Sequence, residues 1–177
     1  MLPQTTHVLK TYDYLVKARE RLFAQARPLT PRQHAEVFEI GLGSLLRTFA
    51  HISGAEWYYI QRLTGAELPP MDQWPIMDEK PPALPVIEAM WLEQAGKTRA
   101  ALAAVGDWGA EVSYEVTLSK TEGERPRRVI ATAADMFTQL VMHEVHHRAQ
   151  AMNILRHLGV AVEDVDYNEM MYRFEDL

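Results

Sequence analysis

The sequence predicts an all-α fold, a four-helix bundle with a small β-hairpin before the fourth helix and a short C-terminal helix. Four long segments repeat apolar residues at three- and four-residue steps, the period of a helix with one buried face. Residues 112–119 instead alternate apolar and polar side chains, as half-buried strands do, and a second short run follows at residues 127–131. With 177 residues, 47% of them apolar, the chain is most simply one globular domain over residues 1–177.

The first two helices are predicted from their caps and breakers. The first covers residues 6–26 and ends before Pro28. The second begins at Thr30-Pro31, because threonine caps helices and proline suits the first helical position. Its apolar pattern continues to about Thr64, but Gly41 and Gly43 predict a bend or break in its middle.

The middle of the chain changes character twice. Residues 66–85 hold six of the ten prolines and are expected to form an extended crossover loop. A third helix follows over residues 85–105. Residues 112–119 and 127–131 then read as two strands joined by a turn over residues 120–124.

The last two helices complete the bundle. Residues 135–158 form the long fourth helix, which stops at Gly159. Residues 166–174 repeat apolar side chains with helical period, and Asp166 with Glu169 resembles a capping box. This tail is therefore expected to pack on the bundle.

Two histidines interrupt the apolar side of the fourth helix. His143 and His147 are four residues apart and so lie one turn apart on the same face. Two imidazoles at this spacing are poor packing groups but suit one metal ion. The better third ligand is His51, on the second helix, which would leave at least one coordination position for water or substrate. His7, His34 and His157 are expected at the surface, and His146 is expected to point in another direction.

A competing interpretation comes from the same segment. Residues 143–147 match H-E-x-x-H, in which Glu144 would be the general base of a zinc protease. The glycine and histidine of the extended form of this motif are missing, because positions 150 and 153 hold Gln150 and Asn153. A glutamate as the third ligand would have to be Glu163 or Glu169. Glu144 is also explained as the partner of Arg148, four residues later, in an exposed helix pair.

The two histidine segments together resemble a known family. Residues 49–65 and 143–159 look like those of the DinB-like (damage-inducible, YfiT-related) four-helix-bundle proteins, which place a histidine on the second helix and H-x3-H-R-x-Q on the fourth. The resemblance spans nearly the whole chain. It implies an up-down-down-up bundle that often forms a homodimer, with a divalent metal ion on His51, His143 and His147. Zinc or nickel is expected before iron or manganese.

The resemblance also implies an activity class. Some such proteins are metal-dependent transferases or isomerases that use low-molecular-weight thiols, and others are hydrolases. We therefore expect a metal-dependent hydrolase or thiol transferase acting on a small molecule. The alternative is a non-enzymatic, stress-related bundle with a structural metal, and a further alternative is the H-E-x-x-H protease. Gln150 and Tyr58 are candidates for contacts around the metal.

The composition of the chain excludes some kinds of site and disfavours some partners. The chain has no cysteine, which excludes disulfides and thiolate ligands and fits a cytoplasmic protein. Its net charge of −6 disfavours nucleic acid as a partner. Neither a signal peptide nor a membrane-spanning segment is predicted.

Overall fold

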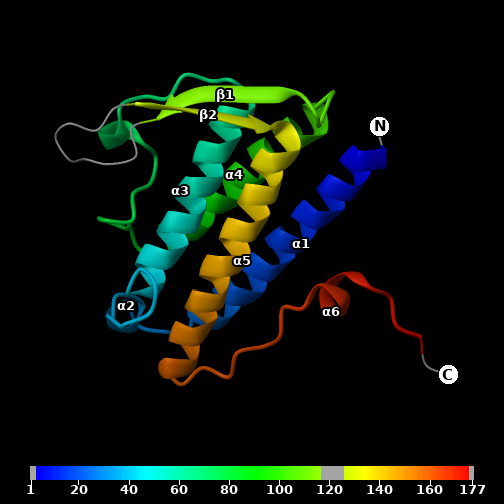
Figure 1. Cartoon of the computed structure of the whole chain (residues 1–177). Coiled ribbons are helices and arrows are strands. Elements are labelled where there is room, and N and C mark those ends of the chain that lie inside the picture. The colour runs from blue at the N-terminus through cyan, green and yellow to red at the C-terminus, as the bar shows by residue number, and fades with distance from the viewer. Residues whose placement is uncertain (1–2, 117–125, 176–177) are drawn as a thin grey trace.

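Four long helices form the body of the computed structural model, which describes residues 3–116 and 126–175 (Figure 1). The bundle helices are α1 (Pro3–Ala26), α3 (Leu45–Leu63), α4 (Leu84–Ala104) and α5 (Ala133–His157). The shorter elements are α2 (Pro31–His34), the 3₁₀ turn η1 (Met71–Gln73), β1 (Glu111–Val116), β2 (Arg127–Thr132) and α6 (Tyr167–Met171). The predicted all-α bundle with a hairpin before its last long helix is confirmed.

The directions of the helices follow from what meets at the hairpin end. The indole of Trp108, just after α4, donates to Thr5 Oγ1 near the start of α1 at 3.0 Å. The carbonyl of Trp108 accepts from the amide of Ala134 at the start of α5. Arg62, near the end of α3, stacks on the ring of Tyr114 in β1. Thus α1 and α5 start at the hairpin end while α3 and α4 finish there, which is the up-down-down-up order (Figure 1).

The core is divided into two apolar clusters along the bundle. One lies toward the hairpin and includes Leu15, Leu102 and Leu140, which are all buried. The other lies toward the opposite end and includes Phe49 and Ile154. Burying these side chains supplies the main driving force for assembling the four helices.

The predicted break in the second helix is larger than a bend. Only α2, a single helical turn, follows the Thr30 cap, and the helix resumes at Leu45. Gly41 and Gly43 between them have φ angles of 52° and 93°, a region that other residues rarely adopt. The hydroxyl of Ser44 then accepts from the amide of Arg47 and caps α3.

The hairpin and the tail close the structure. β1 and β2 pair antiparallel from Glu111 opposite Thr132 to Val116 opposite Arg127. The predicted turn at 120–124 and strand positions 117–119 lie outside the described residues. The tail does pack on the bundle, because the Tyr14 hydroxyl donates to the Val165 carbonyl at 2.8 Å. The capping box predicted for α6 is wrong, since its Asp166 side chain makes no capping hydrogen bond.

Within the described part of the chain, no helix combines the length and the apolar character needed to cross a membrane.

Candidate metal centre

The packing of α3 against α5 brings the three predicted histidines together. His51 projects from α3, and His143 and His147 project from successive turns of α5. The Nε2 atoms of His51 and His143 are 3.0 Å apart. The ring of His147 lies 4.6 Å from that of His51 and 4.5 Å from that of His143, measured between centroids. Two ring nitrogens this close must share either a proton or a metal ion.

The donor set fits a divalent metal ion. One ligand nitrogen from each of the three histidines lies within 4.8 Å of the others. Histidine nitrogens bind zinc at about 2.0–2.1 Å in a tetrahedron, which sets them roughly 3.3 Å apart. Small side-chain movements would therefore complete the geometry. Three protein ligands leave at least one position for water or substrate.

Gln150 orients the ring of His147. The Nδ1–H of His147 donates to Gln150 Oε1 at 2.8 Å, which leaves Nε2 of His147 as the available ligand atom. A Cβ at Gly41 would lie only 2.1 Å from Gln150 Oε1, so a side chain there would displace the amide. Gly41, one of the two glycines that break the second helix, therefore also leaves room for the Gln150 amide beside the histidines.

Asp78 lies beside the ring of His51. Its Oδ2 lies 3.5 Å from Nδ1 of His51, at the far side of the imidazole from His143. Such carboxylate–histidine pairs orient metal ligands and increase their basicity. Asp78 comes from the proline-rich crossover, which is anchored where the backbone of Ile76 passes Gly54 of α3. A Cβ at Gly54 would lie 3.2 Å from the Ile76 carbonyl oxygen.

Sequence reasoning did not find Asp78. One carboxylate within an irregular loop has no periodic pattern that would relate it to a histidine on a helix. Only the path of the crossover over α3 places the two groups together.

The electrostatic environment keeps the histidines ready to bind a cation. Burial lowers the pKa of His143 to about 3, and the neighbouring His147 and His51 add to this effect. Burial and His147 also lower the pKa of His51, although Asp78 opposes them. Because protonated imidazole cannot bind a metal, these shifts keep both rings neutral and available at pH 7.

The predicted pair of Glu144 with Arg148 is present at 4.0 Å, but the prediction that it is exposed is wrong. The Glu144 side chain faces the bundle interior, and the residue is only 2% exposed. Arg19 of α1 donates to both of its carboxylate oxygens, from Nε at 3.0 and 3.1 Å and from Nη2 at 2.5 Å. A carboxylate held in this way is not free to act as the general base of a protease, so the H-E-x-x-H interpretation loses its catalytic group.

Glu144 belongs to a buried ionic layer between the two apolar clusters. Arg19 also contacts Glu56 of α3, with Nη2 2.6 Å from Oε2. Arg148 Nη2 donates to Tyr14 at 2.5 Å, and its Nη1 lies 4.0 Å from Glu144. Glu56 also accepts hydrogen bonds from Tyr12 at 2.5 Å, from Thr98 at 2.6 Å and from Trp91 at 2.7 Å. These residues join all four long helices. We name them the ionic layer, which consists of Tyr12, Tyr14, Arg19, Glu56, Trp91, Thr98, Glu144 and Arg148.

The other histidines do not join the site. His146 is exposed, although its Nε2 lies 3.1 Å from the amide nitrogen of Gln150. His7 and His157 are exposed as predicted. His34 is not a surface residue, because it is 7% exposed and its Nε2 donates to the Ala26 carbonyl at 2.9 Å.

A cleft of about 430 Å³ opens beside the histidines. His51 and His143 line it, together with Tyr58 of α3 and Trp74 of the crossover. Tyr58, a candidate for contacts around the metal, therefore lies in the wall of this cleft. The volume of the cleft is in the range of small-molecule sites.

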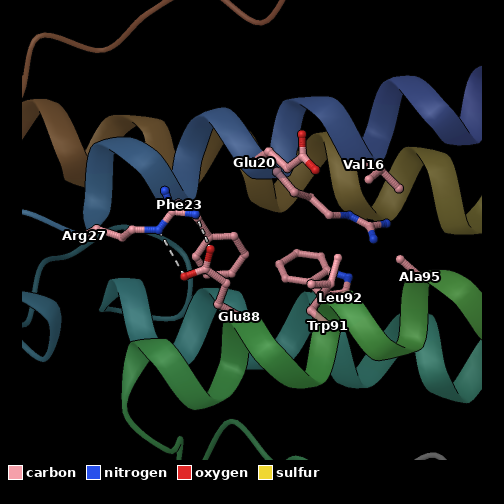
Figure 2. Close-up of a pocket in the computed structure, with 9 residues that line it drawn as sticks. Val16, Glu20, Phe23, Arg27, Glu88, Trp91, Leu92 and Ala95 are labelled. Carbon is pink, nitrogen blue, oxygen red and sulfur yellow. Dashed lines mark hydrogen bonds and ion pairs between the residues drawn. The ribbon is translucent and has the colours of Figure 1, made fainter.

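A second cavity of about 350 Å³ lies between α1 and α4 (Figure 2). The Phe23 and Trp91 side chains lie between the two helices there, and Arg27 pairs with Glu88 across one end. No histidine is among the described residues that line it, so this cavity is separate from the histidine group.

Removing the Gln150 amide should weaken metal binding. Gln150→Ala takes away the acceptor for His147 Nδ1–H, and the loss of such an outer contact typically costs about 10- to 100-fold in affinity. Titration with zinc against a competing chelator would measure the change. Gly41→Ala should act through the same contact, so the double variant should lose little more than Gln150→Ala. Wild-type affinity in Gln150→Ala would show that this contact does not orient the ring.

Comparison with known proteins agrees with these features. The family model described as the DinB family matches residues 1–175 of the chain. A search of curated proteins gave no match.

Proposed function

Because the chain belongs to the DinB family and places three histidines beside an open cleft, we propose that it is a divalent-metal-dependent enzyme acting on a small molecule. The observation that carries the proposal is the histidine group itself, formed by residues from two helices. A site with three protein ligands and a neighbouring cleft of about 430 Å³ is suited to binding substrate at the metal.

The proposed chemistry is hydrolysis or transfer of a small thiol. A metal ion on these ligands would polarise a substrate carbonyl or lower the pKa of bound water or thiol. The chain has no cysteine, so any thiol must arrive as a separate substrate. Zinc and nickel are the proposed metals, followed by iron and manganese, since imidazole ligands accept all four.

A structural role for the metal is the alternative, and the packing favours the enzyme. Two apolar clusters and the ionic layer join the four helices through contacts that do not involve the three histidines. The three histidines are only partly buried, at the edge of the bundle beside the cleft. We further propose a cytoplasmic protein that forms a homodimer and does not bind nucleic acid, in line with its composition and family.

Turnover by metal-loaded protein tests the proposal. Chelated protein would be reloaded with zinc or nickel and assayed against small esters, and against electrophiles with a low-molecular-weight thiol. We expect turnover that chelation abolishes and that His51→Ala lacks, because that variant loses a ligand. A large fall in melting temperature on chelation, with no turnover of any substrate, would instead support the structural role.

A further inference from the structure

We propose that the cleft beside the histidines binds an aromatic, flat substrate body, with the polar end of the molecule directed at the metal. This inference rests on the proposed function, because it names the class of molecule that the same site would accept. It comes from the side chains that form the cleft and from how they are held.

The cleft reaches the histidines. His51 and His143 are among its lining residues, so a molecule bound in it would contact the proposed metal ligands. Ala55 of α3 also lines the cleft and is partly exposed, so little side-chain bulk stands beside His51 at this position. Gly54 is covered by Ile76, which keeps the crossover close to α3.

The wall of the cleft is aromatic. Trp74 and Tyr58 lie with ring centroids 5.5 Å apart and planes inclined by 32°. The Trp74 indole nitrogen donates to the Pro69 carbonyl at 3.1 Å, so its polar atom is already satisfied within the crossover. Tyr59 also lines the cleft, with its ring 5.6 Å from that of Tyr58 and 5.8 Å from that of His143. Rings in this arrangement favour an aromatic ligand in an offset or edge-to-face contact.

The wall is also held in place before any ligand binds. Trp57 supports Trp74 at 5.3 Å, and Arg62 stacks on Tyr58 at 5.1 Å. The crossover behind them is fixed by Ile76, which is 5% exposed and lies against Gly54. A preformed wall gains more affinity from each contact because less side-chain freedom is lost on binding.

A neighbouring cleft of about 820 Å³ shares five crossover residues with the first, namely Met71, Trp74, Ile76, Met77 and Glu79. Its described lining residues include Val86 and Met90 of α4 but no histidine. A ligand there would touch the same aromatic ring without reaching the metal site. The two clefts can therefore be separated by a probe that must bind metal.

Two hydroxamates make such a pair of probes. Benzohydroxamate and acetohydroxamate bind metal through the same group and differ in carrying a phenyl ring or a methyl group. The experiment loads the full chain with Co²⁺ and follows each titration by the visible spectrum of the metal. We expect benzohydroxamate to bind at least about 10-fold more tightly, because only the phenyl ring can use the aromatic wall.

Variants then test whether the difference in affinity between the two probes comes from the aromatic wall. Trp74→Ala should remove most of the preference for benzohydroxamate while leaving acetohydroxamate binding unchanged. Trp74→Phe should restore the preference for benzohydroxamate, because it keeps an aromatic ring in the wall. Val86→Ala, in the neighbouring cleft only, is the matched control and should behave as wild type.

The outcomes distinguish the two proposals. Equal affinities for the two probes in Co²⁺-loaded wild-type protein would overturn the aromatic substrate class and leave the metal site standing. Equal weakening of both probes by Trp74→Ala would also overturn it, since Trp74 would then affect the metal and not the ring. Failure of the wild type to bind Co²⁺ would overturn the metal-dependent function and this inference together.

Discussion

Replacing His51 with alanine should abolish stoichiometric metal binding. The substitution removes the ligand supplied by α3, and the remaining pair, His143 and His147, would hold the ion from one helix alone. The loss should exceed the roughly 10- to 100-fold that outer contacts cost, because a direct ligand is removed. Metal content of protein purified without a histidine tag, measured by elemental analysis, would show about one ion per chain in the wild type and none in the variant.

His7→Ala is a suitable control for this experiment. It makes the same substitution at an exposed histidine of α1, and it should leave the metal content unchanged. If His51→Ala kept its full metal content, the third ligand would have to lie elsewhere in the chain. The three-histidine centre would then be wrong.

Replacing Arg19 with methionine should destabilise the fold by about 3–5 kcal/mol, the usual cost of removing one partner from a buried ion pair. Arg19 is 5% exposed and contacts both Glu56 and Glu144, so its loss leaves two buried carboxylates without their shared cation. Burial lowers the pKa of Arg19, but the two carboxylates outweigh burial and raise it overall, which keeps the guanidinium charged. Methionine retains most of the side-chain length, so lost packing contributes little.

Urea unfolding followed by circular dichroism would measure this effect. Arg27→Met is the matched control, since Arg27 lies on the same helix and pairs with Glu88 at the surface (Figure 2). It should change the free energy of unfolding far less, because an exposed pair is screened by water. Equal effects of the two substitutions would show that the ionic layer does not stabilise the bundle.

The ionic layer and the two histidines of α5 occupy adjacent faces of this helix. Glu144 and Arg148 face the interior, while His143 and His147, each one residue earlier, face α3. One residue along a helix turns it by about 100°, so fixing Glu144 on Arg19 also fixes the direction of the histidines. In the H-E-x-x-H segment, the two histidines therefore belong to the three-histidine group, whereas Glu144 belongs to the ionic layer.

Much of this protein followed from the sequence alone. Helical and alternating periods predicted the four long helices and the hairpin, because burial of one face leaves its period in the residue order. The same logic predicted His143 and His147 as a pair, since a four-residue spacing sets them one turn apart wherever the helix lies. His51 was predicted as the third ligand because a second helix could supply it, and the family pattern pairs the same two helices.

The tertiary structure alone decided the rest. The direction of Glu144 depended on where Arg19 of α1 lies, and a helix pattern does not show which polar residue meets a buried partner. Asp78 and Trp74 come from a crossover loop with no period, so only its path over Gly54 places them beside His51. Periodicity records which face of an element is buried, whereas contacts between distant segments depend on packing that no local pattern contains.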